Sequence, residues 1–527
     1  VTFGCQMNVY DSGRLAELLE ARGWESAASR DEADLIFLNT CSIREKAVQR
    51  VMARLRDLAP LKRARPGLIV AVGGCAAEQE GLELVRRAAI VDIVAGPRRL
   101  SEIPSLLDSF APGDPPVVMG GDPPEEGPGP ADGAPGPGGG SAGPPEIPHD
   151  PPAVPAAGGR RGPAPDAGAG SVPARTARAA VAGKPLILAP SGAAGPAPLS
   201  AFVTIMEGCD NFCAYCVVPG LRGPERSRPP GDVLAEAGSL VSRGAREITL
   251  LGQNVNSYRP GGVPGERGGM AFVRLLEAVS AIPGLRRLRF TTSHPKDFPP
   301  ELPRLFGTLP ALSPHVHLPL QAGSDRVLRL MGRRYDVRGY LETVGALREH
   351  APGASVTSDI IVGFPGETEE DFRMTLRMLE EISFDSIFSF RYSDRPGTRA
   401  LAMPGKVPEE VKAARLGEVI ALQREISLRI NRALVGGVQE VLVSGRGREP
   451  GQLSGRTGTN KIVNFPGPPE LLSSLVRVRI TAAGPVSLRG ELSGAGDPDF
   501  KAPPPGGRAG MVRRAPEGPG PLPAGPR

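Results

Sequence analysis

Apolar runs and helical patterns alternate along residues 1–110. Runs of mostly apolar residues at 1–4, 34–40 and 67–74 predict strands that are buried on both faces, because such strands show no polar alternation. Between these runs the apolar residues recur at helical spacing. Strands that alternate with helices are typical of a parallel sheet, so we expect a doubly wound α/β domain.

Six further strand–helix repeats fill much of residues 201–435. The candidate strands cover 201–207, 246–254, 285–292, 315–321, 355–364 and 386–392. This pattern predicts a curved parallel sheet or partial (β/α)6 barrel, in which the loops at the carboxyl ends of the strands carry the site. A long amphipathic helix is expected over 408–434.

The last ordered region, 436–495, changes to short strands separated by turn residues. Its candidate strands cover 438–444, 461–465, 475–482 and 486–492, which predicts a small β-barrel. Gly and Pro, 69 and 59 in the chain, are concentrated at 111–200 and 496–527. Such segments bury too little apolar surface to offset their chain entropy, so we expect a disordered linker and a disordered tail.

Charge and cysteine content narrow the class of protein. The 62 basic and 57 acidic residues leave a net charge of only +5, and no apolar run is long enough for a transmembrane helix. Six cysteines in 527 residues are too few for a disulfide scaffold. No signal segment opens the sequence. We therefore expect a cytoplasmic protein that functions as a monomer.

Three cysteines stand together directly after the first predicted barrel strand. Cys209, Cys213 and Cys216 have the spacing C-x3-C-x2-C. Three thiolates on one tight loop can bind three irons of a [4Fe–4S] cluster and leave the fourth iron open. A zinc site is the alternative, although structural zinc takes four ligands. Inert buried cysteines are a further possibility.

The other three cysteines are far apart in the sequence. Cys5, Cys41 and Cys75 each fall just after one of the strands predicted in residues 1–110. Because the carboxyl ends of parallel strands lie along one edge of a sheet, these thiols can converge. The alternative is three unrelated small residues in an apolar core.

The motifs around these cysteines carry a family resemblance. CDNFCAYC matches the loop of radical S-adenosylmethionine (SAM) enzymes, whereas TFGCQMNVYDS, LNTCSIREKA and VGGCAAEQEG resemble the N-terminal domain of methylthiotransferases. LLGQNVNSY, LPLQAGSDRVLRLMGR, SDIIVGFPGETEEDF and SGRTGTNKIVNF extend the likeness to the rest of the chain outside the linker and tail. The motifs CQMN and TCSIREKA resemble those of the MiaB type of this family. The MiaB type acts on tRNA.

The resemblance implies a reaction. A cluster on Cys209, Cys213 and Cys216 would bind SAM, whose reductive cleavage supplies a radical that takes the hydrogen from C2 of an adenine. An auxiliary [4Fe–4S] cluster on Cys5, Cys41 and Cys75 would deliver sulfur, and a second SAM would methylate it. The implied substrate is tRNA carrying N6-isopentenyladenosine beside the anticodon. The electron donor would be a protein such as flavodoxin or ferredoxin, and the sulfur source is not indicated.

Five further residues are candidates for binding the cofactor. Tyr215 precedes the last cysteine and could pack on the SAM adenine, although ordinary loop packing explains it equally well. Gln253, Asn254 and Gln321 end predicted strands, where polar ligands are expected. Gly363 opens the GFPGE turn, which permits close backbone approach, although the residues that follow also read as a helix cap.

The C-terminal β-domain resembles the TRAM module, an RNA-binding barrel. Basic and amide side chains in it could face RNA phosphates and contribute salt-sensitive affinity; they are Arg446, Arg448, Arg456, Asn460 and Lys461. A solvated basic face is the alternative.

Two features depart from the family pattern. The linker is much longer than the family's usual connection. After Cys216, Gly220 and Pro224 stand where an aromatic and a polar residue are common, which we expect to loosen contacts with the base or RNA without touching the clusters. Two competing hypotheses remain: a methylthiotransferase for threonylcarbamoyl-adenosine in tRNA or for a ribosomal protein, and a non-catalytic iron–sulfur or zinc RNA-binding protein.

Overall fold

The structure is a computed structural model that describes residues 1–41, 45–120, 175–176, 197–262 and 269–493. It forms two compact units. Unit 1 contains residues 1–189 and 217–224, and unit 2 contains residues 190–216 and 225–527. Most of the predicted linker and all of the predicted tail lie outside the described residues.

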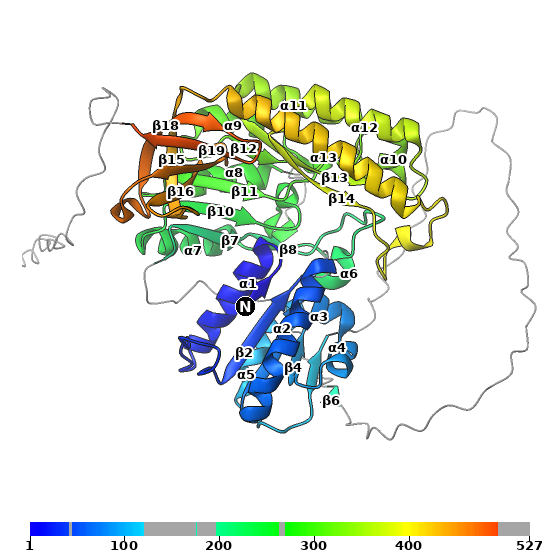
Figure 1. Cartoon of the computed structure of the whole chain (residues 1–527), viewed down its shortest axis with the longest axis vertical. Helices are drawn as coiled ribbons and strands as arrows, with labels where there is room; N and C mark the ends of the chain where they lie inside the picture. The colour runs from blue at the N-terminus through cyan, green and yellow to red at the C-terminus, as the bar shows by residue number, and fades with distance from the viewer. Residues whose placement is uncertain (42–44, 121–174, 177–196, 263–268, 494–527) are drawn as a thin grey trace, which may run out of the picture. The chain divides into compact units, whose positions relative to one another are not determined.

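Unit 1 is built on a six-stranded parallel sheet (Figure 1). Its strands are β1 (Thr2–Phe3), β2 (Leu35–Thr40), β3 (Ile69–Gly74), β4 (Ile93–Ala95), β5 (Val117–Met119) and β6 (Arg175–Thr176). The three predicted strands and the α/β class are confirmed. Two results differ from the prediction. The strands follow one another in sequence order, whereas a doubly wound sheet reverses its order. The sheet also runs past the predicted boundary at residue 110, because β5 and β6 come from the predicted linker.

Helices cover both faces of this sheet. They are α1 (Gln6–Glu20), α2 (Glu45–Ala64), α3 (Cys75–Glu80), α4 (Leu82–Arg87), α5 (Ile103–Leu107), α6 (Val218–Arg222) and the 3-10 helix η1 (Pro97–Glu102). Val70 and Val72 of β3 pack in one apolar cluster with α2, whereas Ile69 and Ala71 pack in another with Leu15 of α1. This two-sided burial explains why the strands carry no polar alternation.

Unit 2 begins with six parallel strands in two adjoining sheets. One contains β7 (Ser200–Thr204), β10 (Glu247–Leu251) and β11 (Arg287–Thr291); the other contains β12 (His315–His317), β13 (Ser355–Val362) and β14 (Ser386–Arg391). A parallel bridge between Leu288 and Leu312 links their edges. Two short strands, β8 (Met206–Glu207) and β9 (Arg226–Ser227), pair antiparallel. The six strand–helix repeats predicted over 201–435 are therefore confirmed.

Helices cover the outer face of these strands. They are α7 (Pro230–Ser242), α8 (Met270–Ser280), α9 (Leu302–Thr308), α10 (Asp325–Leu330), α11 (Val337–His350), α12 (Glu369–Ile382) and α13 (Glu409–Arg432), with the 3-10 turns η2 (Val255–Ser257), η3 (Pro260–Gly262), η4 (Pro295–Asp297) and η5 (Arg399–Ala402). Val356 and Ile360 of β13 belong to the core under these helices, so the alternate residues Thr357 and Asp359 face the inside of the curve. The long helix predicted at 408–434 is α13, which lies beside α12 and β14 in Figure 1.

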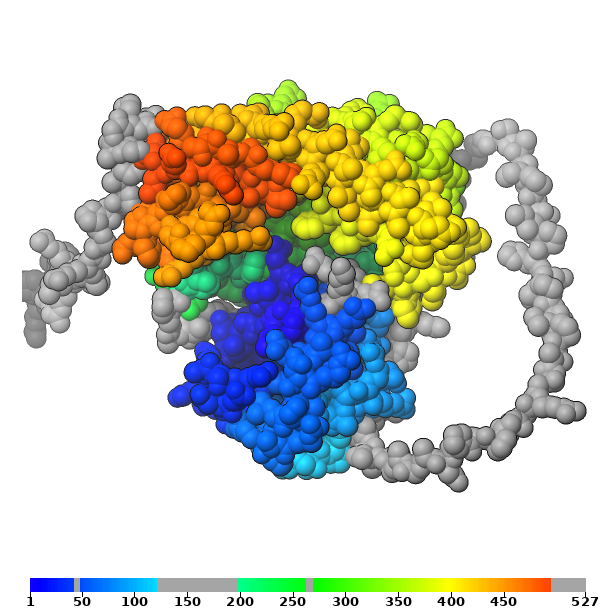
Figure 2. All heavy atoms as spheres, in the orientation of Figure 1, coloured from blue at the N-terminus to red at the C-terminus, as the bar shows by residue number. Residues whose placement is uncertain are grey.

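The rest of unit 2 is a closed five-stranded barrel. It consists of β15 (Val438–Arg446), β16 (Gln452–Thr457), β17 (Ile462–Pro466), β18 (Leu475–Ala483) and β19 (Ser487–Leu492), with the 3-10 turn η6 (Pro469–Leu471). The prediction missed β16, since QLSGRT is mostly polar or glycine and reads as a turn. The barrel surface, orange to red in Figure 2, is continuous with that of the preceding α/β part.

Buried arginines of β11 join this barrel to the parallel strands of unit 2. Arg287 donates to the Arg456 carbonyl at 2.6 Å, and Arg289 donates to the Thr457 carbonyl at 2.8 Å. Lys461 pairs with Asp385 at 2.5 Å between their charged atoms. The two parts of unit 2 are therefore joined by buried charged groups as well as by α13.

Candidate functional site

Three cysteines follow three neighbouring strands of unit 1. Cys5 comes after β1, Cys41 directly after β2 and Cys75 directly after β3, and these strands are adjacent in the sheet. Cys41 and Cys75 are buried, and Cys5 is exposed. The sheet thus brings to one edge three residues that are more than thirty positions apart in sequence, as the pattern predicted.

Two buried asparagines tie the cysteine loops together. Asn8 accepts hydrogen bonds from the Cys5 backbone N–H at 3.2 Å and from the Cys5 thiol at 3.3 Å. Its Nδ2 donates to Asn39 Oδ1 at 2.9 Å, and Asn39 Nδ2 donates to the Asn8 carbonyl at 2.9 Å. Both asparagines are 0% exposed. Sequence analysis missed them, although each stands three or fewer positions from a cysteine.

Glycines allow these loops to approach closely. Gly74, directly before Cys75, has φ +95°, and a Cβ on it would lie 2.4 Å from both the Asn39 Oδ1 and the Thr40 carbonyl. A Cβ on Gly4 would lie 2.3 Å from Asn8 Oδ1. A side chain at either position would push the cysteine loops apart, so the sequence must keep glycine there.

The thiols of this first trio influence each other's ionisation. A hydrogen bond with Cys41 lowers the pKa of Cys5 to about 6, although desolvation of the thiol by its neighbours opposes this shift while the rest of the residue is exposed. The positive charge of Arg222 also lowers this pKa. Burial raises the pKa of Cys75, although Arg222 opposes this effect through its charge and a hydrogen bond. A thiolate is the form that binds metal, so Cys5 is prepared for binding near neutral pH.

The second trio lies on one compact loop of unit 2. The Cys213 N–H donates to the Asn211 carbonyl at 2.8 Å and the Cys216 N–H donates to the Cys213 carbonyl at 3.0 Å, which folds the loop into tight turns. The Asn211 N–H also points at Cys209 Sγ, 3.4 Å away. Cys209 and Cys213 are each 8% exposed, and burial raises the pKa of Cys209 to about 11. N–H groups directed at sulfur are typical of iron–sulfur sites.

Arg333 lies beside this cysteine loop, and sequence analysis did not identify it. Its Nη1 donates to Cys213 Sγ at 3.5 Å, and its Nη2 donates to the Pro319 carbonyl at 3.2 Å. It is the last residue of the quoted motif LPLQAGSDRVLRLMGR, but nothing in its spacing connects it to the cysteines.

Buried polar atoms without a partner gather at the carboxyl ends of adjoining strands. Within the described residues, Gln253 Oε1 after β10, Ser293 Oγ after β11 and Gln321 Oε1 after β12 have no hydrogen-bond partner. Gln321 also has φ +70°, in the left-handed region that non-glycine residues rarely adopt. Unpaired buried polar atoms cost free energy, so such a group is expected where a ligand completes the bonding. Gln253 and Gln321 were predicted on position alone, and Ser293 was missed.

Two other predicted cofactor residues have clear protein contacts. Asn254 is 1% exposed; its Nδ2 donates to Asp297 at 2.7 Å, and its Oδ1 accepts from the His294 N–H at 3.1 Å. Both ends of this amide are bonded inside the protein, so we now assign it to holding the loops rather than to the cofactor. Tyr215 is half-buried with its ring edge-on to Phe364, 6.4 Å between centroids, which fits the loop-packing alternative.

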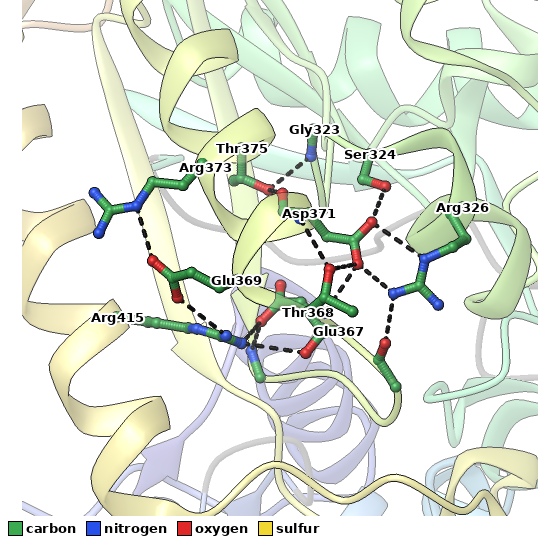
Figure 3. Close-up of polar contacts among 12 residues, drawn as sticks. Gly323, Ser324, Arg326, Glu367, Thr368, Glu369, Asp371, Arg373, Thr375 and Arg415 are labelled. Carbon is green, nitrogen blue, oxygen red and sulfur yellow. Dashed lines mark hydrogen bonds and ion pairs between the residues drawn. The ribbon is translucent and has the colours of Figure 1, made fainter.

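The GFPGE turn is held by an ion pair between its last residue, Glu367, and Arg415 of α13 (Figure 3). The Gly363 N–H donates to Glu367 at 2.6 Å, and Arg415 of α13 bonds the same carboxylate at 2.8 Å. Gly363 has φ +72°, and a Cβ on it would lie 2.3 Å from Lys412 Cγ. Packing against α13 therefore explains this glycine without a ligand, and its contact with a cofactor stays a prediction.

The helix that follows this turn starts with a strong cap, also drawn in Figure 3. Thr368 and Asp371 form a reciprocal capping box, and Asp371 also accepts from Ser324 at 2.6 Å and forms an ion pair with Arg326. Burial would raise the pKa of Asp371, but the bonds from Arg326, Ser324 and Thr368 lower it below its ordinary value. The predicted helix cap is confirmed.

The residues predicted to contact RNA divide into two groups. Arg446 and Arg448 are exposed. Lys461 is committed to Asp385, with side chains only 11% and 16% exposed, so we no longer expect it to face phosphates. Arg456 donates to Asn460 Oδ1 at 3.1 Å, which places this pair in the turn beside β11. The prediction did not foresee that the turn joins two domains.

The donor sets fit iron–sulfur clusters better than a single ion. Among the described residues, no three Cys, His, Asp or Glu side chains are arranged to hold one metal ion. A zinc ion needs its ligands to meet at one centre, whereas a cubane gives each thiolate its own iron.

In the part of the chain that the structure describes, no helix combines the length and apolar character needed to cross a membrane.

Comparison with protein families divides the chain in the same way as the fold. Residues 1–96 match the uncharacterized protein family UPF0004, residues 203–379 match the radical SAM superfamily, and residues 432–493 match the TRAM domain.

Full-length relatives share one description. The tRNA-2-methylthio-N(6)-dimethylallyladenosine synthase of Moorella thermoacetica is 42% identical over 495 residues, 93% of this chain and 97% of that protein. The protein of the same name from Syntrophobacter fumaroxidans is 44% identical over 93% of this chain and 94% of its own length. That of Methylococcus capsulatus is 43% identical over 95% of this chain and 97% of its own length.

Proposed function

We propose how the reaction is divided among the residues of this chain, which belongs to the MiaB-type family of radical SAM tRNA methylthiotransferases, the tRNA-2-methylthio-N6-dimethylallyladenosine synthases. Dimethylallyl is another name for the isopentenyl group predicted on the substrate. The chain is thus an enzyme that acts on tRNA, and its family uses a [4Fe–4S] cluster with SAM.

Cys209, Cys213 and Cys216 hold the cluster that works with SAM. Three thiolates leave one iron free for the cofactor. Gln253 and Gln321 accept hydrogen bonds from SAM through their Oε1 atoms, which are buried and have no partner among the described residues. The buried loop keeps water from the site where the radical forms.

Cys5, Cys41 and Cys75 hold the auxiliary cluster. Asn8 and Asn39 fix the three loops, and the low pKa of Cys5 provides one thiolate at neutral pH. When bound, the two clusters supply an electron for SAM cleavage and sulfur for insertion at C2 of the adenine; the protein orients the reactants and excludes side reactions.

The C-terminal barrel contributes RNA affinity through Arg446 and Arg448. These guanidinium groups are exposed, so they can contact phosphates. The electron donor is a small protein of the flavodoxin or ferredoxin class, and the enzyme works in the cytoplasm as a monomer. The substrate is tRNA with N6-isopentenyladenosine beside the anticodon.

One observation carries this assignment. The loops that bear Cys5, Cys41 and Cys75 leave neighbouring strands and interlock through two buried asparagines and two obligatory glycines. Cysteines in an apolar core would need no such arrangement of loops. The arrangement therefore supports a group bound to these thiols.

Nucleoside mass spectrometry of reacted tRNA tests the function. The chain, reconstituted anaerobically with iron and sulfide, is incubated with SAM, a one-electron reductant and tRNA carrying N6-isopentenyladenosine. We expect 2-methylthio-N6-isopentenyladenosine from the native chain. Product only from threonylcarbamoyl-adenosine tRNA would reject the substrate.

Two cysteine variants separate the roles of the trios. Cys75→Ala should still cleave SAM to 5′-deoxyadenosine but form no methylthio product. Cys213→Ala should do neither. Methylthio product from Cys75→Ala would refute the role of the first trio.

A further inference from the structure

One buried arginine stands beside each cysteine trio. Arg333 Nη1 lies 3.5 Å from Cys213 Sγ, and the positive charge of Arg222, at the end of α6, acts on the Cys75 thiol at the start of α3, the helix on which α6 packs. Arg333 is 8% exposed and Arg222 is 6% exposed. Two unrelated parts of the chain therefore direct a guanidinium group at a cysteine sulfur.

The Arg333 guanidinium is held on several sides. Its Nη2 donates to the Pro319 carbonyl at 3.2 Å, and its Nε donates to the Tyr335 hydroxyl at 3.2 Å. The guanidinium carbon also lies 5.1 Å from the centre of the Tyr335 ring. Within the described residues Arg333 forms no ion pair with a carboxylate, so its positive charge is not neutralised by one.

The Arg222 guanidinium is held differently. It pairs with Asp11 of α1 at 2.8 Å, and the two side chains are only 5% and 1% exposed. Its helix, α6, packs on α3, which begins with Cys75. Sequence analysis did not connect Arg222 with the first cysteine trio.

We propose that Arg222 and Arg333 are positioning residues, each of which raises the reduction potential of the cluster held by its own cysteine trio. This inference rests on the proposed function, which assigns a cluster to each trio. Hydrogen bonds to sulfur, net charge and exposure set the potential of such clusters.

The sign of the expected shift in reduction potential follows from charge. Reduction adds one electron, so the reduced cluster is the more negative form. A fixed cation and an N–H donor stabilise that form more than the oxidised one. Asp11 opposes Arg222, so the effect of Arg222 should be smaller than that of Arg333, and neutralising Asp11 should raise the potential.

A crossed set of full-length variants tests this inference. Protein R, with Cys5, Cys41 and Cys75 changed to Ala, keeps only the second trio. Protein X, with Cys209, Cys213 and Cys216 changed to Ala, keeps only the first trio. Each is reconstituted and then titrated with dithionite and mediators in the absence of SAM, and the reduced cluster is followed by electron paramagnetic resonance. R222Q and R333Q are made in both proteins, so each arginine serves as the control for the other.

We expect R333Q to lower the equilibrium constant for reduction of protein R at least tenfold, ~59 mV for one electron. R222Q should lower that of protein X about threefold, ~28 mV by the same conversion. Each substitution should leave the other protein's potential unchanged. D11N should shift protein X upward, a reversal of sign that general damage to the fold would not produce. R333K should recover at least half of the shift.

The possible failures are distinguishable. If protein X binds no iron, the proposed function of the first trio fails and the inference about Arg222 fails with it. If protein X and its R222Q form both bind about four irons but have equal potentials, only the inference fails. Equal shifts in both proteins from one arginine, or a downward shift from D11N, would also overturn it.

Discussion

Arg415→Met should destabilise the radical SAM part of unit 2 strongly, although Arg415 touches no reacting group. Its guanidinium is 2.8 Å from Glu367, and the two side chains are only 7% and 1% exposed. The same carboxylate accepts the Gly363 N–H at 2.6 Å. Removing Arg415 leaves this carboxylate buried with one backbone donor, so the turn after β13 loses its anchor on α13 (Figure 3).

The magnitude follows from the cost of an unpaired buried charge. Breaking a buried ion pair by removing one partner costs ~3–5 kcal/mol. Replacing both partners by neutral groups is often close to neutral. The double variant E367Q/R415M keeps an oxygen for the Gly363 N–H, so it should cost ~1 kcal/mol or less. The double variant should therefore be ~2–4 kcal/mol more stable than R415M.

The penalty should also depend on pH. Burial raises the pKa of Glu367 even with Arg415 and Gly363 opposing it, and loss of Arg415 raises it further. A carboxyl group whose pKa is raised on folding favours the folded state in its protonated form. The deficit of R415M is therefore absent below the unfolded pKa of ~4.3 and grows as pH rises toward the folded pKa, by at most ~1.4 kcal/mol per pH unit.

Native-state hydrogen exchange of peptides from β13 and α12 measures this effect locally. Trp24, the single tryptophan, lies in unit 1, so its fluorescence transition in urea is an internal control that should not move. We expect the free energy of opening obtained from exchange to fall further below the native value in R415M at pH 8 than at pH 5.5, and to be near-native in E367Q/R415M. Equal exchange in native and R415M chains, or a double variant as unstable as R415M, would refute the reasoning.

Three other substitutions test separate parts of the structure. R446M should reduce the slope of log Kobs against log salt for tRNA binding by about one. K461M should leave this slope unchanged and lower thermal stability instead, because Lys461 pairs with Asp385. Equal slopes for both variants would contradict the division of the basic residues into RNA-binding and structural groups. Q321M should weaken SAM binding about tenfold in calorimetry without loss of stability, because its Oε1 has no protein partner within the described residues; unchanged affinity would remove Gln321 from the cofactor site. G363A should lower the free energy of unfolding by ~2 kcal/mol or more, since the left-handed φ alone costs ~1–2 kcal/mol and its Cβ meets Lys412; a melting temperature equal to that of the native chain would show that α13 yields easily.

The sequence predicts well what depends on short-range pattern. The buried strands before Cys41 and Cys75 are marked by apolar runs, and their parallel pairing places both cysteines at one edge. The cap at Thr368 and Asp371 is a local signal four residues long. Strand β16 was missed because its barrel environment, and not its own hydrophobicity, makes QLSGRT a strand.

Contacts between polar residues that are far apart in the chain cannot be predicted from local sequence patterns. Arg333 meets Cys213 across 120 positions, and Arg222 meets Asp11 across 211. Nothing local marks these arginines in a chain that holds 62 basic residues. The same limit explains Lys461, which looks like a phosphate ligand in sequence but is paired with Asp385 in the fold.

The iron content of the chain without its first trio tests the central claim most directly. The claim is that two separate cysteine trios each hold a four-iron cluster. After anaerobic reconstitution, the native chain should contain about eight irons, and the variant with Cys5, Cys41 and Cys75 changed to Ala should contain about four. The same iron content in both proteins would contradict the claim.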